Sequence, residues 1–187
     1  MTTFREFQTT YKPDIRPEGL MKRVRYALQI DSQFTGAFGA IIRELRGEID
    51  FWPDKIVLQL MQYRKLDERF GGDQMDILRG LFKVHRAAIL SGKFEDDYFA
   101  SLEDLALFFI YHDIRAIWVV GAFKKAICET IETIAGGRQA GGRSAAYFTM
   151  LNFLVLELDQ IQRVYVRYAE VTGAMSNDPT NSVTLAG

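Results

Sequence analysis

Apolar residues recur every three or four positions along most of this chain, which is the spacing of helices that each bury one face. The pattern runs from about Leu20 to Leu45, with a break at Asp31 and Ser32, residues that favour helix N-termini. We therefore predict two helices in this stretch. A third is expected to begin at Pro53, since proline is accepted in the first helical turn, and to end near Phe70, before a pair of glycines.

Further helices are expected in the second half of the chain, over about residues 73–90, 93–114, 115–135 and 144–171. The last is the longest, and the apolar residues expected on its inward face are Phe148, Leu151, Leu154, Val155, Leu158, Ile161 and Val164. No segment shows a convincing strand or hairpin pattern. The chain is thus predicted to be all-α, with six to eight helices in a globin-like fold or a helical bundle.

Length and composition fit one compact domain. The chain has 187 residues, of which 48% are hydrophobic and 25% charged, enough to bury one full-sized core. Residues 1–18 contain two prolines and little periodicity, so we expect a flexible N-terminal arm there. The predicted domain covers residues 19–172, and residues 173–187, which are small and polar, are expected to form a flexible tail.

The charge balance argues against nucleic acid or a membrane surface as a partner. Lys plus Arg number 23 and Asp plus Glu number 24, so the net charge is -1 and no basic surplus is present. The sequence starts without a secretory signal and contains no apolar run of about 18 residues, so a cytoplasmic location is expected. The single cysteine, Cys128, has no second cysteine for a disulfide or a shared metal site.

Catalytic chemistry has no support in the sequence. No set of His, Cys, Asp and Glu has the spacing of metal ligands, and no serine lies in a Gly-x-Ser-x-Gly setting. Residues 137–144, GRQAGGRS, approach a phosphate-binding loop, but a predicted helix precedes them and Arg143 replaces the lysine that such a loop needs. A non-enzymatic protein is therefore expected.

A more specific pattern lies in residues 85–123, HRAAILSGKFEDDYFASLEDLALFFIYHDIRAIWVVGAF. His85, Gly92, the acidic stretch at Asp96 and the motif Trp-x-x-Gly-Ala-Phe from Trp118 resemble the central part of the bacterial globin-coupled sensors. Flanking pieces with a weaker resemblance are MQYRKLD at 61–67 and LELDQ at 156–160. The resemblance covers about residues 20–170. It implies a globin-like sensor fold whose last two helices pair with those of a second copy in a four-helix dimer contact.

In this family the histidine that binds haem iron lies nine residues before the tryptophan of the motif, and here Phe109 occupies that position. A phenyl ring has no lone pair for iron, so the resemblance implies a member without conventional haem ligation. Phe108, Phe109 and Trp118 are then expected to line an apolar pocket. Tyr63 and Leu81, which stand where relatives carry residues of the distal side, are expected to complete it.

His112, three residues after Phe109, leaves haem binding open as an alternative. It lies about 4.5 Å further along the helix and about 60° around its axis, so it could act as the proximal ligand only if the helix register shifted. The other interpretation is a polar residue near a helix end that bonds a carbonyl or Asp113. For His85 we expect a solvated or structural role rather than ligation.

These expectations combine into one functional hypothesis. The chain is predicted to be a non-enzymatic sensor globin without haem, whose pocket is filled by side chains or holds an apolar, fatty-acid-like molecule. Pocket occupancy would bias a homodimer contact, and a separate protein would receive the signal. The alternative is an oxygen or redox sensor in which His112 holds haem and Tyr63 faces bound oxygen. A structural adaptor with a solid core is a third possibility.

Overall fold

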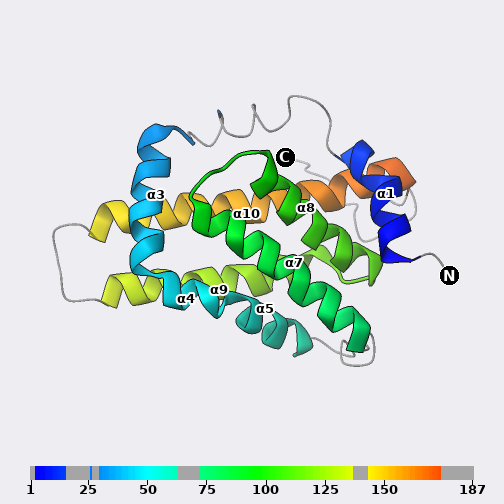
Figure 1. The fold of residues 1–187 in the computed structure, drawn as a ribbon, viewed down its shortest axis with the longest axis horizontal. Helices are drawn as coiled ribbons and strands as arrows, with labels where there is room; N and C mark the ends of the chain where they lie inside the picture. The colour runs from blue at the N-terminus through cyan, green and yellow to red at the C-terminus, as the bar shows by residue number, and fades with distance from the viewer. Residues whose placement is uncertain (1–2, 16–25, 27–29, 63–71, 137–142, 174–187) are drawn as a thin grey trace, which may run out of the picture.

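The computed structural model describes residues 3–15, 26, 30–62, 72–136 and 143–173, and every element in them is a helix (Figure 1). The all-α prediction is confirmed for this part of the chain. The elements are α1 (Phe4–Ile15), α3 (Ser32–Glu44), α4 (Arg46–Asp50), α5 (Trp52–Met61), α7 (Gly72–Ser91), α8 (Asp96–Tyr111), α9 (Ala116–Gly136) and α10 (Arg143–Thr172). None of these described helices is both long and apolar enough to cross a membrane. The predicted tail, apart from Gly173, lies outside the described residues.

Local signals place several helix ends where the sequence predicts them. The Asp31 carboxylate accepts a hydrogen bond from the Phe34 N–H at 2.8 Å and so caps α3. Pro53 lies in the first turn of α5. Gly92, which follows α7, has a φ of 67°, a conformation that glycine adopts without strain. The end predicted near Phe70 lies outside the described residues.

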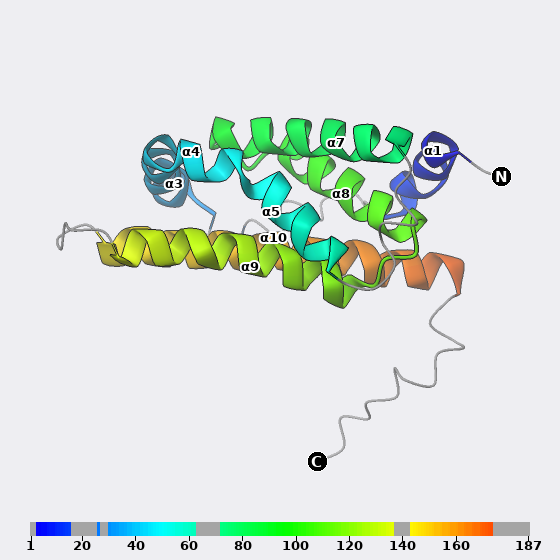
Figure 2. The same ribbon diagram turned by 90° about the horizontal axis from the view of Figure 1, so that it is seen from below.

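Two groups of helices face each other across the core. α9 and α10 lie side by side, and α7 and α8 lie across from them (Figure 2). α3 packs against α10 and α7 at one end of the molecule, while α1 packs against α8 and α10 at the other (Figure 1). α5 packs mainly against α9. The interior between α7, α8 and α10 is therefore enclosed from several sides.

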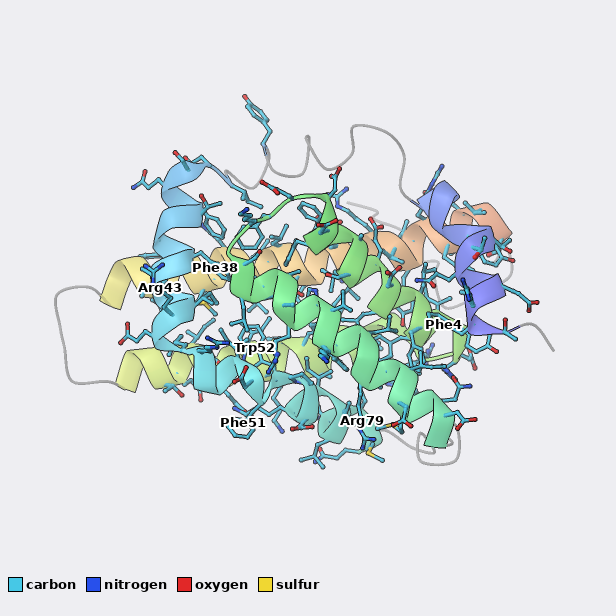
Figure 3. All side chains as sticks on the ribbon, viewed as in Figure 1. Phe4, Phe38, Arg43, Phe51, Trp52 and Arg79 are labelled. Atoms are coloured by element: carbon cyan, nitrogen blue, oxygen red, sulfur yellow. The ribbon has the colours of Figure 1, made fainter. Side chains whose placement is uncertain are left out.

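An aromatic cluster joins four helices at the α3 end of the core. The ring centroid of Phe38 lies 4.9 Å from that of Phe94 and 4.8 Å from that of Phe153. Trp52 stacks on Phe153 at 5.7 Å and donates its indole N–H to Thr130 at 2.8 Å. Figure 3 labels Phe38 and Trp52 in this cluster. The rings join α3, α5 and α10, and the bond from Trp52 to Thr130 adds α9.

The N-terminal segment differs from the flexible arm that we expect over residues 1–18. Residues within it form α1, and the buried ring of Phe4 lies 5.3 Å from that of Phe108 on α8. The ring of Phe7 lies 5.6 Å from that of Tyr168 on α10. Aromatic residues spaced by three and four give α1 an apolar face, which the nearby prolines obscure in the sequence. The packed unit therefore begins well before the predicted boundary at residue 19.

The rotation of α10 about its axis also differs from the prediction. Phe148 and Val155, expected inside, are 63% and 50% exposed. The residues buried on α10 are Thr149, Met150, Phe153, Leu154, Leu156, Glu157, Gln160, Ile161 and Val164. Because Glu157 and Gln160 belong to this inward face, apolar residues alone give the wrong centre for it.

Alanine at Phe153 tests this rotation of α10. The variant Phe153→Ala loses a fully buried ring, so we expect the free energy of unfolding to fall by about 3–5 kcal/mol. The matched control on the same helix is Phe148→Ala, whose exposed ring should change it by less than about 0.5 kcal/mol. Urea unfolding followed by circular dichroism at low protein concentration measures both. Equal losses would contradict the described rotation.

Candidate functional site

Four polar side chains form a buried cluster where α7, α8 and α10 meet. His85 comes from α7, Tyr98 and Ser101 come from α8, and Glu157 comes from α10. His85 is 3% exposed and Glu157 is 1% exposed. The imidazole Nδ1 lies 2.9 Å from the Ser101 Oγ, and Nε2 lies 3.3 Å from the Glu157 Oε2. Tyr98 donates its hydroxyl to the Glu157 Oε1.

Ser101 links His85 to the backbone of α8. The Ser101 hydroxyl lies within hydrogen-bond distance of the Tyr98 carbonyl oxygen, at 2.7 Å. Nδ1 of His85 lies 2.9 Å from the same hydroxyl oxygen, and the tautomer of the ring decides which of the two groups donates. Nε2 is the nitrogen that faces Glu157. The cluster thus fixes the orientation of the ring.

Tyr98 stays protonated in this environment. Burial raises the pKa of Tyr98 well above its ordinary value, and the negative charge of Glu157 together with the hydrogen bond between the two groups raises it further. The phenol therefore acts as a hydrogen-bond donor to the carboxylate across the accessible pH range. This donor satisfies one oxygen of a carboxylate that would otherwise be costly to bury.

Helical spacing brings the cluster together. On α7, His85 lies on the same buried face as Leu78, Phe82 and Ile89. On α10, Glu157 follows the buried Phe153 by four residues. The sequence does indicate a buried polar cluster, because a charged or polar residue on an apolar helical face needs a hydrogen-bond partner in the interior. We expected His85 to be solvated or structural, and its burial decides for the structural role.

A small cavity lies directly beside the cluster. Its volume is about 20 Å³, which is room for about one water molecule. The described residues that line it are Ile49, Trp52, Pro53, Ile56, Phe82, His85, Arg86, Ile89, Phe123 and Glu157. Arg86, on α7, pairs with Asp50 of α4 at 2.7 Å, and both side chains are partly exposed. The apolar walls therefore lead from a surface ion pair to the buried His85 and Glu157.

A larger hollow of about 520 Å³ lies along α7 and α8. Small and charged residues line it, including Ala87, Ala100, Lys93 and Asp97. Asp104, at its α1 end, accepts a hydrogen bond from the side-chain amide of Gln8 at 2.6 Å. Polar and apolar side chains both line this hollow, so it differs in character from the apolar pocket that the sequence predicts.

Two of the predicted pocket residues lie side by side in the core. Phe108 and Phe109 are both fully buried, and their ring centroids lie 6.0 Å apart. Phe108 also contacts Phe4 of α1, and the Phe109 ring lies 6.5 Å from that of Phe82 on α7. Leu81 and Trp118 are half-buried and pack at the edge of the core. The position of Tyr63 lies outside the described residues. Among described residues, the lining of the cavity beside His85 includes none of this set.

His112 lies at the end of α8, as the polar interpretation predicts. Its Nε2 lies 3.1 Å from the Gln74 side-chain oxygen, and its ring centroid is 4.5 Å from that of Phe108. Haem needs an imidazole nitrogen that faces a space as large as the porphyrin. His112 bonds Gln74, and His85 bonds Ser101 and Glu157 beside a space of about 20 Å³. In the described part of the chain, the residues do not fit haem.

The remaining chemistry of the described residues is limited. They contain no group of three or more His, Cys, Asp or Glu side chains that could hold a metal ion. Cys128 is half-buried. Comparison with protein families, curated proteins and solved structures found no match to this chain. The resemblance to globin-coupled sensors therefore stays a prediction from the residues quoted above.

Removing the Tyr98 hydroxyl tests the cluster. Tyr98→Phe leaves a buried carboxylate oxygen of Glu157 without its donor, so we expect a loss of about 1–3 kcal/mol in the free energy of unfolding. Tyr147→Phe, on the more exposed Tyr147 of α10, is the control and should be close to neutral. Thermal and urea unfolding measure both. A neutral Tyr98→Phe would show that the hydroxyl does not stabilise Glu157.

Proposed function

We propose that this chain is a non-enzymatic regulatory domain of the sensor-globin kind, which works without conventional haem ligation and pairs with a second copy through α9 and α10. The observation that carries the proposal is a row of exposed apolar side chains on α10 that points away from the core. The resemblance of residues 85–123 to bacterial globin-coupled sensors supports it. The proposed location is the bacterial cytoplasm, and a separate signalling protein would receive the output.

The apolar row on α10 consists of Phe148, Val155 and Val166, which are 63%, 50% and 49% exposed. Their spacings of seven and eleven residues place them within about 20° of one another around the helix axis. Glu157, on the buried face, lies on the opposite side of the same helix. On the neighbouring α9, Ile117 is 67% exposed. Asp159 and Gln162 lie on the same side of α10 between Val155 and Val166, so the row is mixed in its second half.

A second copy of the chain is the partner that we propose for this face. α9 and α10 lie side by side at one side of the molecule, and no other described helix covers their outer surface (Figure 2). A two-fold axis beside α10 would place the apolar row of one copy against that of the other. Two α9–α10 pairs would then form a four-helix contact, the arrangement that the resemblance implies.

The cavity beside Trp52, Phe82 and Phe123 is the place that we propose for an apolar small molecule of the fatty-acid kind. At about 20 Å³ it is closed to such a ligand, so binding requires α5 to move away from α7. The Asp50–Arg86 ion pair at the surface is a contact that such a movement would break, and exposed pairs of this kind contribute about 1 kcal/mol or less.

Contacts between α5 and α9 would carry that movement to the dimer face. Lys55 pairs with Glu129 at 3.1 Å, and Lys125 donates to the Gln59 side chain at 2.7 Å. The buried bond from Trp52 to Thr130 adds a third link. A ligand between α5 and α7 would therefore shift α9 together with α5. It would change pairing only as far as it prefers one arrangement of the helices over the other.

A charge in the apolar row should separate the two copies. Val155→Glu places a carboxylate in the centre of the proposed contact, so we expect a dimer to become a monomer in light scattering after gel filtration, with helical content unchanged. Val84→Glu is the matched control, because Val84 is a 60% exposed valine on α7, away from α9 and α10. The proposal fails if the parent chain is monomeric at tens of micromolar, or if both variants dissociate equally.

Native mass spectrometry tests the apolar ligand. The protein, purified from cells without detergent, should carry a small apolar molecule that solvent extraction releases. Ile56→Trp should reduce its occupancy, because the larger side chain fills the cavity. Leu58→Trp, on the exposed side of the same helix, should leave occupancy unchanged. A parent protein with no bound molecule and no affinity for added fatty acids would favour a solid-core adaptor instead.

A further inference from the structure

α1 covers an aromatic surface that α8 and α10 form together, at the opposite end of the molecule from α3 (Figure 1). We call it the docking surface, and its residues are Asp104, Phe108 and Tyr111 of α8 and Tyr168 of α10. Phe4, Phe7 and Tyr11 of α1 face it, at spacings of three and four that place them on one side of the helix. α1 is therefore an amphipathic helix that lies on a surface of matching rings.

The rings of α1 contact both helices of the docking surface. The Phe7 ring centroid lies 5.3 Å from that of Tyr111 and 5.6 Å from that of Tyr168, so this ring bridges α8 and α10. The Tyr11 ring centroid lies 5.1 Å from that of Tyr168. Edge and tilted contacts between aromatic rings add to the gain from burial alone. The contact thus depends on a few aromatic anchors.

Most rings at this contact stay partly in water, unlike those at the α3 end. The half-buried rings are those of Phe7, Tyr11, Tyr111 and Tyr168. The fully buried rings of the cluster at the α3 end are those of Phe38, Phe94 and Phe153. Three of the four half-buried rings belong to tyrosines, which can present the hydroxyl to water when the ring is uncovered. Separation of α1 from the domain is therefore less costly than separation of a core helix.

α1 is also a self-contained but short helix. It has 12 residues, a length at which a helix is marginal by itself in water. Its start needs no other element, because the Thr3 hydroxyl oxygen accepts the Glu6 N–H at 3.3 Å and the Glu6 carboxylate accepts the Thr3 N–H at 2.7 Å. We therefore expect α1 to open as one unit, at a lower free energy than the domain as a whole.

We propose that α1 is a displaceable helix, and that the docking surface beneath it binds an amphipathic helix of a partner protein. α1 itself shows what the surface accepts, namely aromatic residues at i, i+3 and i+7, the usual anchors of a helix that binds in this way. It also shows a polar requirement, because the Gln8 side-chain amide donates to Asp104 at 2.6 Å. Residues 16–31 keep α1 attached when it opens, so it competes with the partner at a high effective concentration. The proposal does not depend on the dimer contact or the apolar ligand proposed above.

A labelled peptide of residues 3–15 tests whether the docking surface accepts a separate helix. In Phe4→Ala/Phe7→Ala, α1 loses two anchors and uncovers the surface, so we expect the peptide to bind this variant at least about tenfold more tightly than the parent in fluorescence anisotropy. The matched control is Arg5→Ala/Thr10→Ala, at two exposed positions of α1, which should bind the peptide as weakly as the parent does. Equal affinity for the parent and for Phe4→Ala/Phe7→Ala, or no binding to either, would overturn the proposal.

A change at Tyr168 locates the bound peptide. Added to Phe4→Ala/Phe7→Ala, Tyr168→Ala removes the ring that faces Phe7 and Tyr11, so the affinity for the peptide should fall about tenfold. Tyr147→Ala, near the other end of α10, is the control and should leave the affinity unchanged. A peptide that binds equally well after Tyr168→Ala would lie elsewhere on the domain, and the proposal would be wrong.

Hydrogen exchange on the parent chain tests the displacement of α1 without any variant. We expect the amide hydrogens of α1 to exchange through local opening, at least about tenfold faster than the protected amide hydrogens of α8. Exchange of α1 only together with the whole domain would show that it does not open separately, and this result would also overturn the proposal.

Light scattering separates a partner protein from a second copy of this chain. If α1 of a second copy filled the docking surface, Phe4→Ala/Phe7→Ala would convert a dimer into a monomer, and the assignment to a partner protein would be wrong. We expect this variant to keep the oligomeric state of the parent. The dimer contact proposed above is tested separately by Val155→Glu, so the two proposals fail on different variants.

Discussion

The contact between His85 and Glu157 constrains the whole helical arrangement, because a carboxylate that is 1% exposed must keep its partners. Leaving a buried polar group without its partner typically costs about 1–3 kcal/mol, and more where that group is charged, which is a large part of the stability of a domain this size. The partners come from α7, α8 and α10, so all three helices must hold the correct rotation and register at once. Apolar burial drives the packing, and the cluster adds the requirement that its polar groups keep their partners.

The inward position of Glu157 also determines which residues of α10 are exposed at the surface. With Glu157 turned inward, Phe148, Val155 and Val166 necessarily lie on the outer side of α10. A single helix thus carries the buried cluster on one face and the proposed dimer contact on the other. α5, in turn, is linked to α9 through Trp52 and Thr130, so the cavity wall and the outer layer are mechanically connected. These links would carry a movement at the cavity wall to the outer layer.

Several of the described helices were predictable, because local chemistry fixes their ends. Asp31 caps a helix and Pro53 begins one, whatever the rest of the chain does. The rotation of α10 was not predictable, because it depends on the residues of two other helices that bond Glu157. A pattern that counts only apolar residues assigns such a carboxylate to the surface. It therefore predicts the wrong buried face for the helix. The buried cluster could have been suspected from Glu157 between Leu156 and Leu158, but its partners Tyr98 and His85 are 59 and 72 residues away in sequence. Long-range pairing of this kind is set by the fold.

The N-terminal helix was missed because two prolines hid the aromatic face of α1 in the sequence. The most direct test of the central claim is a double-mutant cycle with His85→Leu and Glu157→Leu, read by urea unfolding. The cluster predicts that each single change is strongly destabilising and that the double change costs at least about 2 kcal/mol less than their sum. Additive losses would show that the two side chains do not depend on each other, and the role given to them here would be wrong.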